Sequence, residues 1–333
     1  MTLCMAALEW LSQMPDAVWQ QHAPPVWTVL AAALGILWLL LPLGFPARWL
    51  GAVGLMPMFL VLPSQPEQGA LWLSVLDVGQ GLSVVVQTQN HALLYDTGPR
   101  YTADADSGSR IVVPYLRAAG IKRLDGLIVT HDDSDHSGGA ISVLDAVPVG
   151  WLASSLPADS PILLHAQKSL PCFAGQKWEW DGVYFEMLHP GWTSYADEAV
   201  SKNNRGCTLK ITTPYGSVLL PADIERESEA ELLVRSPGSL PATVLVAPHH
   251  GSKTSSTEEF IRQTNPQIVV FTAGYRNQFG HPKLEVVERY RALGSRLYRS
   301  DRDGAVLLHF ERDGGPSLQV WRQERRRYWQ EIN

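Results

Sequence analysis

The stretch LIVTHDDSDHSGGA, residues 127–140, decides the fold. An apolar run rich in β-branched residues ends at Thr130, and two glycines near the end of the stretch lead into a helical pattern. The turn between them carries four residues of metal-ligand type: His131, Asp133, Asp135 and His136. Alternate residues of an extended turn point the same way, so His131 and Asp133 can hold one metal ion. Asp135 and His136 then point to a second ion. The spacing predicts a two-metal site rather than a charged surface turn.

Two later strand ends supply the remaining ligands. Asp223, in SVLLPADIE, follows an apolar strand and is placed to bridge two ions with one carboxylate. His249 and His250, in VLVAPHHGS, follow another apolar strand, and one imidazole there completes the second site. We favour His250 as that ligand. Ligands gathered from separate strand ends are how such a centre is assembled.

The overall charge limits the class of partner. The chain has 333 residues and a formal net charge of -6, so it is not the strongly basic protein expected of a non-specific nucleic-acid binder. One basic cluster near the C-terminus consists of Arg322, Arg325, Arg326 and Arg327 beside Trp321, Tyr328 and Trp329. A solvated helix face is the favoured interpretation of this cluster, and phosphate contacts are the alternative.

The three cysteines, Cys4, Cys172 and Cys207, show neither a zinc-ribbon nor a CxxC spacing. Cys172 and Cys207 can pair in an oxidising compartment. Spacing alone does not bring their Cα atoms within bonding distance, so the pairing stays open.

The N-terminal region, residues 1–65, is predicted to be a membrane segment. Residues 26–43 form an uncharged apolar run near the lower length limit for a bilayer span, and residues 49–62 form a second. We expect a transmembrane helical hairpin, with a buried helix pair as the alternative. Arg48, in the turn, places that turn in the cytoplasm and the following domain outside. Upstream, Leu8, Leu11 and Val18 indicate an amphipathic helix on the membrane surface.

A linker at 63–69 leads to a predicted hydrolase domain at 70–333. Strands are expected at 71–77, 82–87, 91–96, 127–130, 183–188, 209–212, 217–220, 243–247, 267–272 and 305–310. Helices are expected at 111–119, 140–146, 225–235, 257–263 and 283–293. Strands mixed with helices over this length predict a layered α/β architecture.

These motifs together resemble a known family. The order of DTG at 96–98, the HxDxDH turn with its glycines, Asp223 and HHGS is similar to the metallo-β-lactamase superfamily. Within it, residues 71–310 resemble the C-terminal domain of the ComEC family of DNA-internalisation competence proteins. The motifs that carry this resemblance are LDVGQG (76–81), YDTGPR (95–100), VPYLRAAGI (113–121), the HDDSDHSGG turn, KNNR (202–205), PHHGS (248–252) and FGHP (279–282). The resemblance implies an αββα sandwich preceded by the last membrane helices of the family.

The sequence departs from the superfamily pattern at the first metal. Most members have a second histidine at the position of Asp133, and a further histidine where this chain has Asn203 or Asn204. The oxygen-rich set tolerates Mn²⁺ or Mg²⁺ as well as Zn²⁺, and the asparagine makes the first ion weakly held. His189, in MLHP, is an alternative ligand, for which a structural role is favoured.

The resemblance implies a metal-dependent phosphodiesterase that acts on DNA and degrades the strand that is not imported. Two divalent ions would activate water and polarise a phosphate oxygen. Asp135 would orient the water and accept its proton, and whichever of His249 and His250 is not a ligand would protonate the leaving oxygen.

Four further residues receive supporting roles. Asp77 and Asp96, after strand ends, are candidates to orient the ligand imidazoles. Asn277 and His281, in NQFGHP, are candidates to contact substrate phosphate, with a structural histidine as the alternative.

The implied setting is the bacterial inner membrane, with the hydrolase domain on its outer, periplasmic side. Implied partners are DNA, other competence proteins, the lipid bilayer and the remaining membrane channel domain. Complete family members have a large channel region that this chain lacks, so it is expected to be a fragment or split product. Two alternatives stay open: a hydrolase of small esters, lactones or phosphodiesters, and a non-catalytic membrane-anchored platform.

Overall fold

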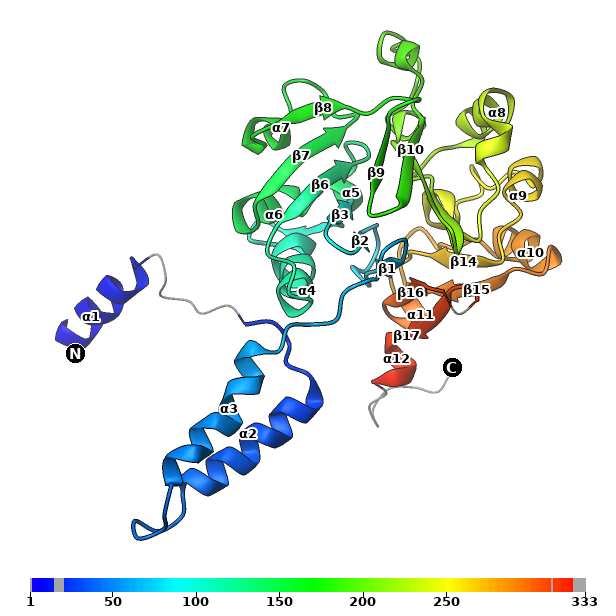
Figure 1. Cartoon of the computed structure of the whole chain (residues 1–333). Helices are drawn as coiled ribbons and strands as arrows, with labels where there is room; N and C mark the ends of the chain where they lie inside the picture. Colours follow the sequence, from blue (N-terminus) through cyan, green and yellow to red (C-terminus); the bar gives the residue numbers. More distant parts are fainter. Residues whose placement is uncertain (1, 15–20, 313, 326–333) are drawn as a thin grey trace. The chain divides into compact units, whose positions relative to one another are not determined.

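The computed structural model describes residues 2–14, 21–312 and 314–325. The chain forms two compact units (Figure 1). The smaller comprises Met1–Ser64 and Tyr115–Lys122, and the larger comprises Gln65–Pro114 and Arg123–Asn333.

The smaller unit contains a helical hairpin. Its helices are α1 (Thr2–Ser12), α2 (Val26–Leu39), the 3-10 turn η1 (Arg48–Leu50) and α3 (Gly51–Leu60). Glycines allow α2 and α3 to approach closely, because a Cβ atom on Gly35 would lie 2.4 Å from the Gly51 carbonyl oxygen. Arg48 donates from Nε to the carbonyl of Leu39, which closes the turn. The hairpin is therefore present, although none of the helices among the described residues is long and apolar enough to cross a bilayer.

The larger unit contains two sheets. The first has eight strands in the order β17-β16-β1-β2-β3-β6-β7-β8. Their bounds are β1 Leu71–Val75, β2 Val84–Gln87, β3 Ala92–Tyr95, β6 Leu124–Val129, β7 Val149–Ser154, β8 Ser169–Pro171, β16 Val306–Phe310 and β17 Ser317–Val320. A separate two-stranded ribbon is made of β4 (Arg100–Thr102) and β5 (Ala105–Asp106).

The second sheet has seven strands in the order β15-β14-β13-β12-β11-β10-β9. Their bounds are β9 Lys177–Trp180, β10 Val183–His189, β11 Thr208–Thr213, β12 Gly216–Leu220, β13 Val244–Val246, β14 Ile268–Phe271 and β15 Arg296–Arg299. Strands β12 to β15 are parallel, as are β3, β6, β7 and β8 in the first sheet. The carboxyl ends of the parallel strands carry the loops that hold the candidate site.

The helical segments of this unit are short. They are η2 (Gly108–Val112), α4 (Val113–Ala118, which ends in the smaller unit), α5 (Ser134–Ser137), α6 (Ala140–Ala146), α7 (Pro161–His165), η3 (Trp192–Tyr195), η4 (Asn203–Arg205), α8 (Arg226–Arg235), η5 (Pro237–Ser239), η6 (Pro248–Gly251), α9 (Glu258–Thr264), α10 (Leu284–Ala292), α11 (Ser300–Asp303) and α12 (Trp321–Glu324).

Alternation along the strands creates the layers. In β12, Val218 and Leu220 join the main core between the two sheets, whereas Leu219 faces the opposite way. Leu219 packs in a second cluster with apolar side chains of α8, α9 and α10, such as Phe260 and Tyr290. Figure 1 shows α8 to α10 gathered beside this sheet and α6 and α7 beside β6 and β7. Strands buried on both faces explain the continuous apolar runs of the sequence.

Every predicted strand and helix of this unit has a counterpart in the structure, with ends shifted by a few residues. The predicted layered α/β fold is confirmed. Several elements were not predicted, among them β7, β9 and β15. The segments KWEW of β9 and RLYR of β15 mix charged and aromatic residues and lie at opposite edges of the sheet, where the apolar signal is weak.

Candidate metal centre

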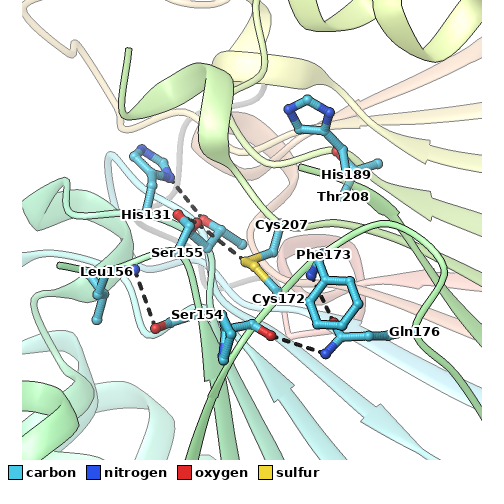
Figure 2. Close-up of a disulfide and its surroundings, with 12 residues drawn as sticks. His131, Ser154, Ser155, Leu156, Cys172, Phe173, Gln176, His189, Cys207 and Thr208 are labelled. Carbon is cyan, nitrogen blue, oxygen red and sulfur yellow. Dashed lines mark hydrogen bonds between the residues drawn. A yellow bond between two sulfur atoms is a disulfide. The ribbon is translucent and has the colours of Figure 1, made fainter. Parts of the chain in front are cut away.

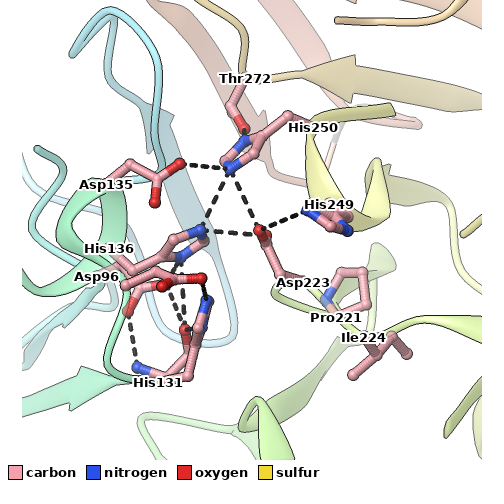
Figure 3. A network of polar contacts seen from close by, with 12 residues as sticks. Asp96, His131, Asp135, His136, Pro221, Asp223, Ile224, His249, His250 and Thr272 are labelled. Atoms are coloured by element: carbon pink, nitrogen blue, oxygen red, sulfur yellow. Dashed lines mark hydrogen bonds and ion pairs between the residues drawn. The ribbon is translucent and has the colours of Figure 1, made fainter. Parts of the chain in front are cut away.

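The carboxyl ends of four strands carry Asp96 and the candidate ligands other than Asn203. Asp96 follows β3, and the ligand turn of residues 131–136 follows its parallel neighbour β6. Asp223 follows β12, and His249 and His250 follow the parallel neighbour β13. Figure 3 shows these side chains pointing toward one another from both sheets.

The ligand turn is fixed by neighbouring loops. The backbone N–H of Leu82 donates to the carbonyl of Asp135, and that of Thr97 donates to the carbonyl of His136. Gly81 has a φ of +138°, and a Cβ atom there would lie 2.3 Å from the Asp135 carbonyl oxygen. Only glycine permits this approach, which explains the LDVGQG motif in physical terms.

Asp135, His136, Asp223 and His250 form the tightest cluster, which we call the second site. His136 Nε2 lies 3.1 Å from Asp223 Oδ1 and 3.2 Å from His250 Nε2. His250 Nε2 lies 3.3 Å from Asp135 Oδ2 and 3.5 Å from Asp223 Oδ2. Two imidazole nitrogens and two carboxylates directed at one point form a donor set that fits a divalent transition-metal ion.

Hydrogen bonds on the far side of the rings fix their orientation. Asp96 Oδ2 lies 2.7 Å from His136 Nδ1, and Thr272 Oγ1 lies 3.0 Å from His250 Nδ1. Asp96 is held in turn by the backbone N–H and hydroxyl of Thr130. Because Nδ1 is engaged in both rings, Nε2 is left to face the centre, as in metal-binding histidines generally. Thr130 and Thr272 were not predicted from the sequence.

His131, Asp133 and Asn203 surround the neighbouring position, which we call the first site. The ligand atoms of His131, His136 and Asp223 lie within 4.8 Å of one another. Among the described residues, His131 Nε2 and Asn203 Oδ1 are buried without a hydrogen-bond partner. The closest acidic atom to His131 Nε2 is Asp133 Oδ2 at 3.4 Å. Buried polar atoms normally have partners, so these two unpaired atoms fit a cation.

Asp133 has a competing partner. Its Oδ1 atom forms an ion pair with Nζ of Lys202, from the segment just before η4. The neighbouring His131 ring and Lys202 lower the pKa of Asp133 to about 2, against the opposing effect of burial. The first site therefore has a candidate ligand that is ion-paired with a lysine, whereas the described second-site carboxylates pair with histidines.

The two asparagines of the KNNR motif have different surroundings. Asn204 Oδ1 accepts hydrogen bonds from the backbone N–H of Glu225 and from the hydroxyl of Ser228, both at 2.9 Å. His189 is buried, and its ring contacts the Asn204 carbonyl through Nε2 at 2.8 Å and Arg235 through Nδ1 at 3.2 Å. Asn204 and His189 thus hold the loop in place, which leaves Asn203 as the residue of the pair with an uncommitted amide oxygen.

The histidines and carboxylates in and around the second site shift one another's pKa values. Burial by itself lowers the pKa of His136, but the carboxylates of Asp223 and Asp96 outweigh burial and hold that pKa well above its usual range. Burial raises the pKa of Asp223, yet His136 and His250 outweigh it and hold that pKa well below its usual range. Without an ion, the cluster therefore consists of imidazolium and carboxylate groups, and a divalent ion would displace the protons.

His249 and His250 leave a left-handed turn in different directions. Their φ angles are +49° and +53°. The His250 side chain is 3% exposed and joins the second site, whereas that of His249 is 22% exposed. His249 Nε2 lies 3.7 Å from Asp223 Oδ2, and its Nδ1 lies 3.2 Å from the hydroxyl of Thr254. His249 therefore borders the centre from its open side.

Two of the predicted supporting residues, Asp77 and Asn277, are engaged in other contacts. Asp77 pairs with Arg322 at 2.9 Å, so the structure does not show it orienting a ligand imidazole. Asn277 uses its amide group to close its own turn, donating to the carbonyls of Gly274 and His281 and accepting from the backbone N–H of His281. The structure therefore leaves Asn277 no free amide group for phosphate.

His281 does reach the site. Its ring centroid lies 5.9 Å from that of His249, and its Nδ1 atom is buried without a hydrogen-bond partner among the described residues. Burial, with the nearby His250 and His249, lowers the pKa of His281 to about 4. His281 is therefore neutral at pH 7.

In the C-terminal basic cluster, Arg322 also donates to the carbonyl of Asp301, and Arg325 stacks over Trp321 at 5.3 Å. Arg326, Arg327, Tyr328 and Trp329 lie outside the described residues.

A disulfide lies beside the first site. Cys172 and Cys207 are bonded, with a Cα–Cα distance of 6.0 Å, so the pairing that the sequence left open is present. The bond joins the residue after β8 to the residue before β11. The backbone N–H of Cys207 donates to the carbonyl of Thr130, the residue before His131. Figure 2 shows His131 and Ser154 to Leu156 around the disulfide.

The amino-acid sequence is similar to a known protein family and to several individual proteins. Residues 76–273 match the model of the metallo-β-lactamase superfamily. The chain is 35% identical over 325 residues to "Competence protein ComA" of Neisseria gonorrhoeae, covering 97% of this chain and 44% of that protein. It is 32% identical to "Recombination protein 2" of Haemophilus influenzae, covering 72% and 29%.

A third relative is "ComE operon protein 3" of Bacillus subtilis, 30% identical over 279 residues, with 76% of this chain and 35% of that protein covered. The chain thus spans less than half the length of these relatives. On these matches, and on the ligand turn they contain, the chain is a member of the metallo-β-lactamase superfamily and, within it, of the ComEC family.

Proposed function

We propose that the larger unit is a metal-dependent phosphodiesterase that cleaves DNA during DNA uptake and degrades the strand that is not imported. The observation that carries the hydrolase assignment is the convergence of Asp135, His136, Asp223 and His250 within 3.1 to 3.5 Å. The relatives named as competence and recombination proteins support DNA as the substrate.

The donor sets support two divalent ions of unequal affinity. The second site would hold its ion through Asp135, His136 and His250, with Asp223 shared between the sites. The first site would use His131, Asp133 and the amide oxygen of Asn203, an oxygen-rich set that accepts Mn²⁺ or Mg²⁺ as well as Zn²⁺. Bound divalent ions supply Lewis-acid chemistry and lower the pKa of water.

The chain's own groups supply the proton transfers. Asp135 is 28% exposed at the open side of the cluster, where it can orient the attacking water and accept its proton. His249, held by Thr254 beside Asp223, is placed to donate a proton to the leaving oxygen. His281, beside His249, completes the wall on that side.

We also propose that the smaller unit attaches the chain to the bacterial inner membrane, with the larger unit on the outer side. Leu34, Leu37 and Leu43 are 68%, 63% and 93% exposed, and such apolar surface favours contact with lipid or with a channel domain. A disulfide is typical of an oxidising compartment. A reporter fused after Asn333 that is active only in the cytoplasm would contradict this orientation.

The catalytic proposal is tested with metal-free protein and end-labelled DNA. Mn²⁺, Mg²⁺ and Zn²⁺ are added separately, and the parent is compared with Asp135→Asn and with Asp159→Asn, a change outside the site. We expect metal-dependent cleavage by the parent and by Asp159→Asn, and loss of cleavage with Asp135→Asn. If folded parent protein binds ions but leaves DNA intact, the remaining functions are hydrolysis of a small diester or ester and a non-catalytic platform.

A further inference from the structure

We infer that a cavity beside the metal centre binds an unpaired nucleotide, so that the enzyme acts on single-stranded DNA. This inference rests on the proposed phosphodiesterase function and narrows its substrate. The cavity has a volume of about 660 Å³ and lies within the larger unit. That size is in the range of pockets that enclose a small organic ligand.

The cavity shares a wall with the metal centre. Asp132, in the ligand turn, lines it, and so does Lys202, which pairs with Asp133. Ser155, on the same wall, donates its hydroxyl to the carbonyl of Thr130 at 2.6 Å. A nucleotide in the cavity would therefore have a phosphate next to the ligand turn.

Aromatic surface is available in the cavity. Trp192 lines it and is 63% exposed, so its ring is accessible to a ligand. The Trp192 ring contacts Phe173 edge to face, with centroids 5.0 Å apart, so it has a supported position. Tyr195 also lines the cavity, and its hydroxyl donates to the Cys172 carbonyl at 2.7 Å. The disulfide thereby helps to fix the aromatic wall.

Positive charge accompanies the aromatic surface. Arg205 lines the cavity and donates from Nε to the Ser194 carbonyl and from Nη2 to the Asp197 carbonyl. These acceptors are neutral, and no carboxylate within the described part of the chain is ion-paired with Arg205. Lys202, paired with Asp133, adds a second cation, and Asp132 is the one carboxylate among the described residues that line the cavity.

An exposed aromatic ring beside cations is the arrangement that binds single-stranded nucleic acid, where bases stack and phosphates meet positive charge. In the interior of a duplex both faces of each base are covered by its neighbours, so such a base cannot enter and stack on Trp192. The cavity therefore selects an unpaired nucleotide, and the metal centre cleaves the adjacent phosphodiester.

The test measures binding without cleavage. Fluorescence anisotropy of a labelled 12-nucleotide single strand, and of the blunt duplex of the same sequence, is recorded with the full chain in EDTA. We expect the single strand to bind at least tenfold more tightly than the duplex. Trp192→Ala should weaken single-strand binding about tenfold, and Trp192→Phe should restore most of it.

Two matched controls accompany these variants. Trp321→Ala removes another exposed tryptophan, and it should leave affinity unchanged. Lys177→Met is compared with Lys202→Met, because both lysines pair with a carboxylate and their side chains are 65% and 57% exposed. We expect weaker binding and a smaller salt dependence only with Lys202→Met.

Equal affinity of Trp192→Ala and the parent, or equal binding of duplex and single strand, would overturn the inference. So would a loss with Trp321→Ala that matches the loss with Trp192→Ala, since it would place DNA at the C-terminal cluster. Because the assay needs no metal, its failure is distinct from failure of the proposed function. If the single strand binds selectively but no ion supports cleavage, the nuclease proposal is wrong and the inference about the cavity stands. If DNA is cleaved but single strand and duplex bind equally, the inference is wrong and the nuclease proposal stands.

Discussion

The second site and the first site share Asp223 but differ in how their other ligands are supported. In the second site each imidazole is held from behind, by Asp96 for His136 and by Thr272 for His250. In the first site Asp133 pairs with Lys202, and the third candidate ligand is the Asn203 amide, from a loop. For the proposed two-ion centre, this difference predicts that the second site binds its ion tightly and that the first site binds its ion weakly.

The largest expected effect comes from the residue proposed to serve both sites. Asp223→Ala should abolish binding of both ions and reduce DNA cleavage by at least about a thousandfold, because both sites lose a carboxylate ligand. Metal content measured by mass spectrometry and cleavage of end-labelled DNA check this. Asp159→Ala, a change outside the site, should keep both properties. Retention of both ions by Asp223→Ala would separate the cluster from metal binding.

Single-site variants sharpen the comparison. His250→Ala should remove the tightly bound ion and reduce cleavage about 100-fold to 1,000-fold. His131→Ala should remove the weaker ion and reduce cleavage about tenfold, because that ligand serves the site with fewer supported donors. Calorimetric titration of metal-free protein gives both affinities. The predicted difference between the two sites is wrong if both variants lose the same ion, or if DNA cleavage falls by the same factor in both.

Reduction of the disulfide tests whether the first site depends on its surroundings. Cys172 and Cys207 are 35 residues apart in sequence, and their loss, as a double change to serine, should lower the free energy of unfolding by about 2–4 kcal/mol. Because Cys207 follows the KNNR loop, first-site affinity should fall more than second-site affinity. Denaturant unfolding and metal titration measure the two effects, and an equal fall at both sites would contradict the comparison.

The smallest effects separate the two asparagines. Asn204→Ala should lower the free energy of unfolding by about 1–2 kcal/mol, because the backbone N–H of Glu225 loses its acceptor and Ser228 loses one of two. Asn203→Ala should leave unfolding nearly unchanged and weaken only the first ion. Each variant is the control for the other in thermal unfolding and metal titration, and exchanged phenotypes would assign the ligand to Asn204.

The sequence predicted what depends on short-range pattern. The apolar runs of β6, β12 and β13 marked their strand ends, and parallel pairing then brought His131, Asp223 and His250 to one edge. The sequence could not predict which side chains that lie far apart in the chain come into contact. Asp77 pairs with Arg322, 245 residues away, and no local pattern indicates that contact.

At Asn277 the sequence did not indicate the turn contacts that the structure shows. Its amide closes its own turn, a common use of asparagine, and contact with phosphate stays a prediction. The neighbouring residues also could not show which of Asn203 and Asn204 keeps an uncommitted amide oxygen. That depends on which amide faces the first turn of α8. Thr130 and Thr272 could have been predicted as partners of the site residues. Thr130 directly precedes His131, and Thr272 follows β14, the neighbour of the strand that leads to His250.

The central claim is that DNA cleavage depends on two metal sites of unequal affinity. One titration tests this claim most directly. Metal-free protein receives Mn²⁺ in fractions of an equivalent while cleavage of a labelled single strand is followed. We predict two binding phases, a tight ion and then a weaker one, with cleavage appearing with the first and rising with the second. Full occupancy by both ions without cleavage of DNA would contradict the account.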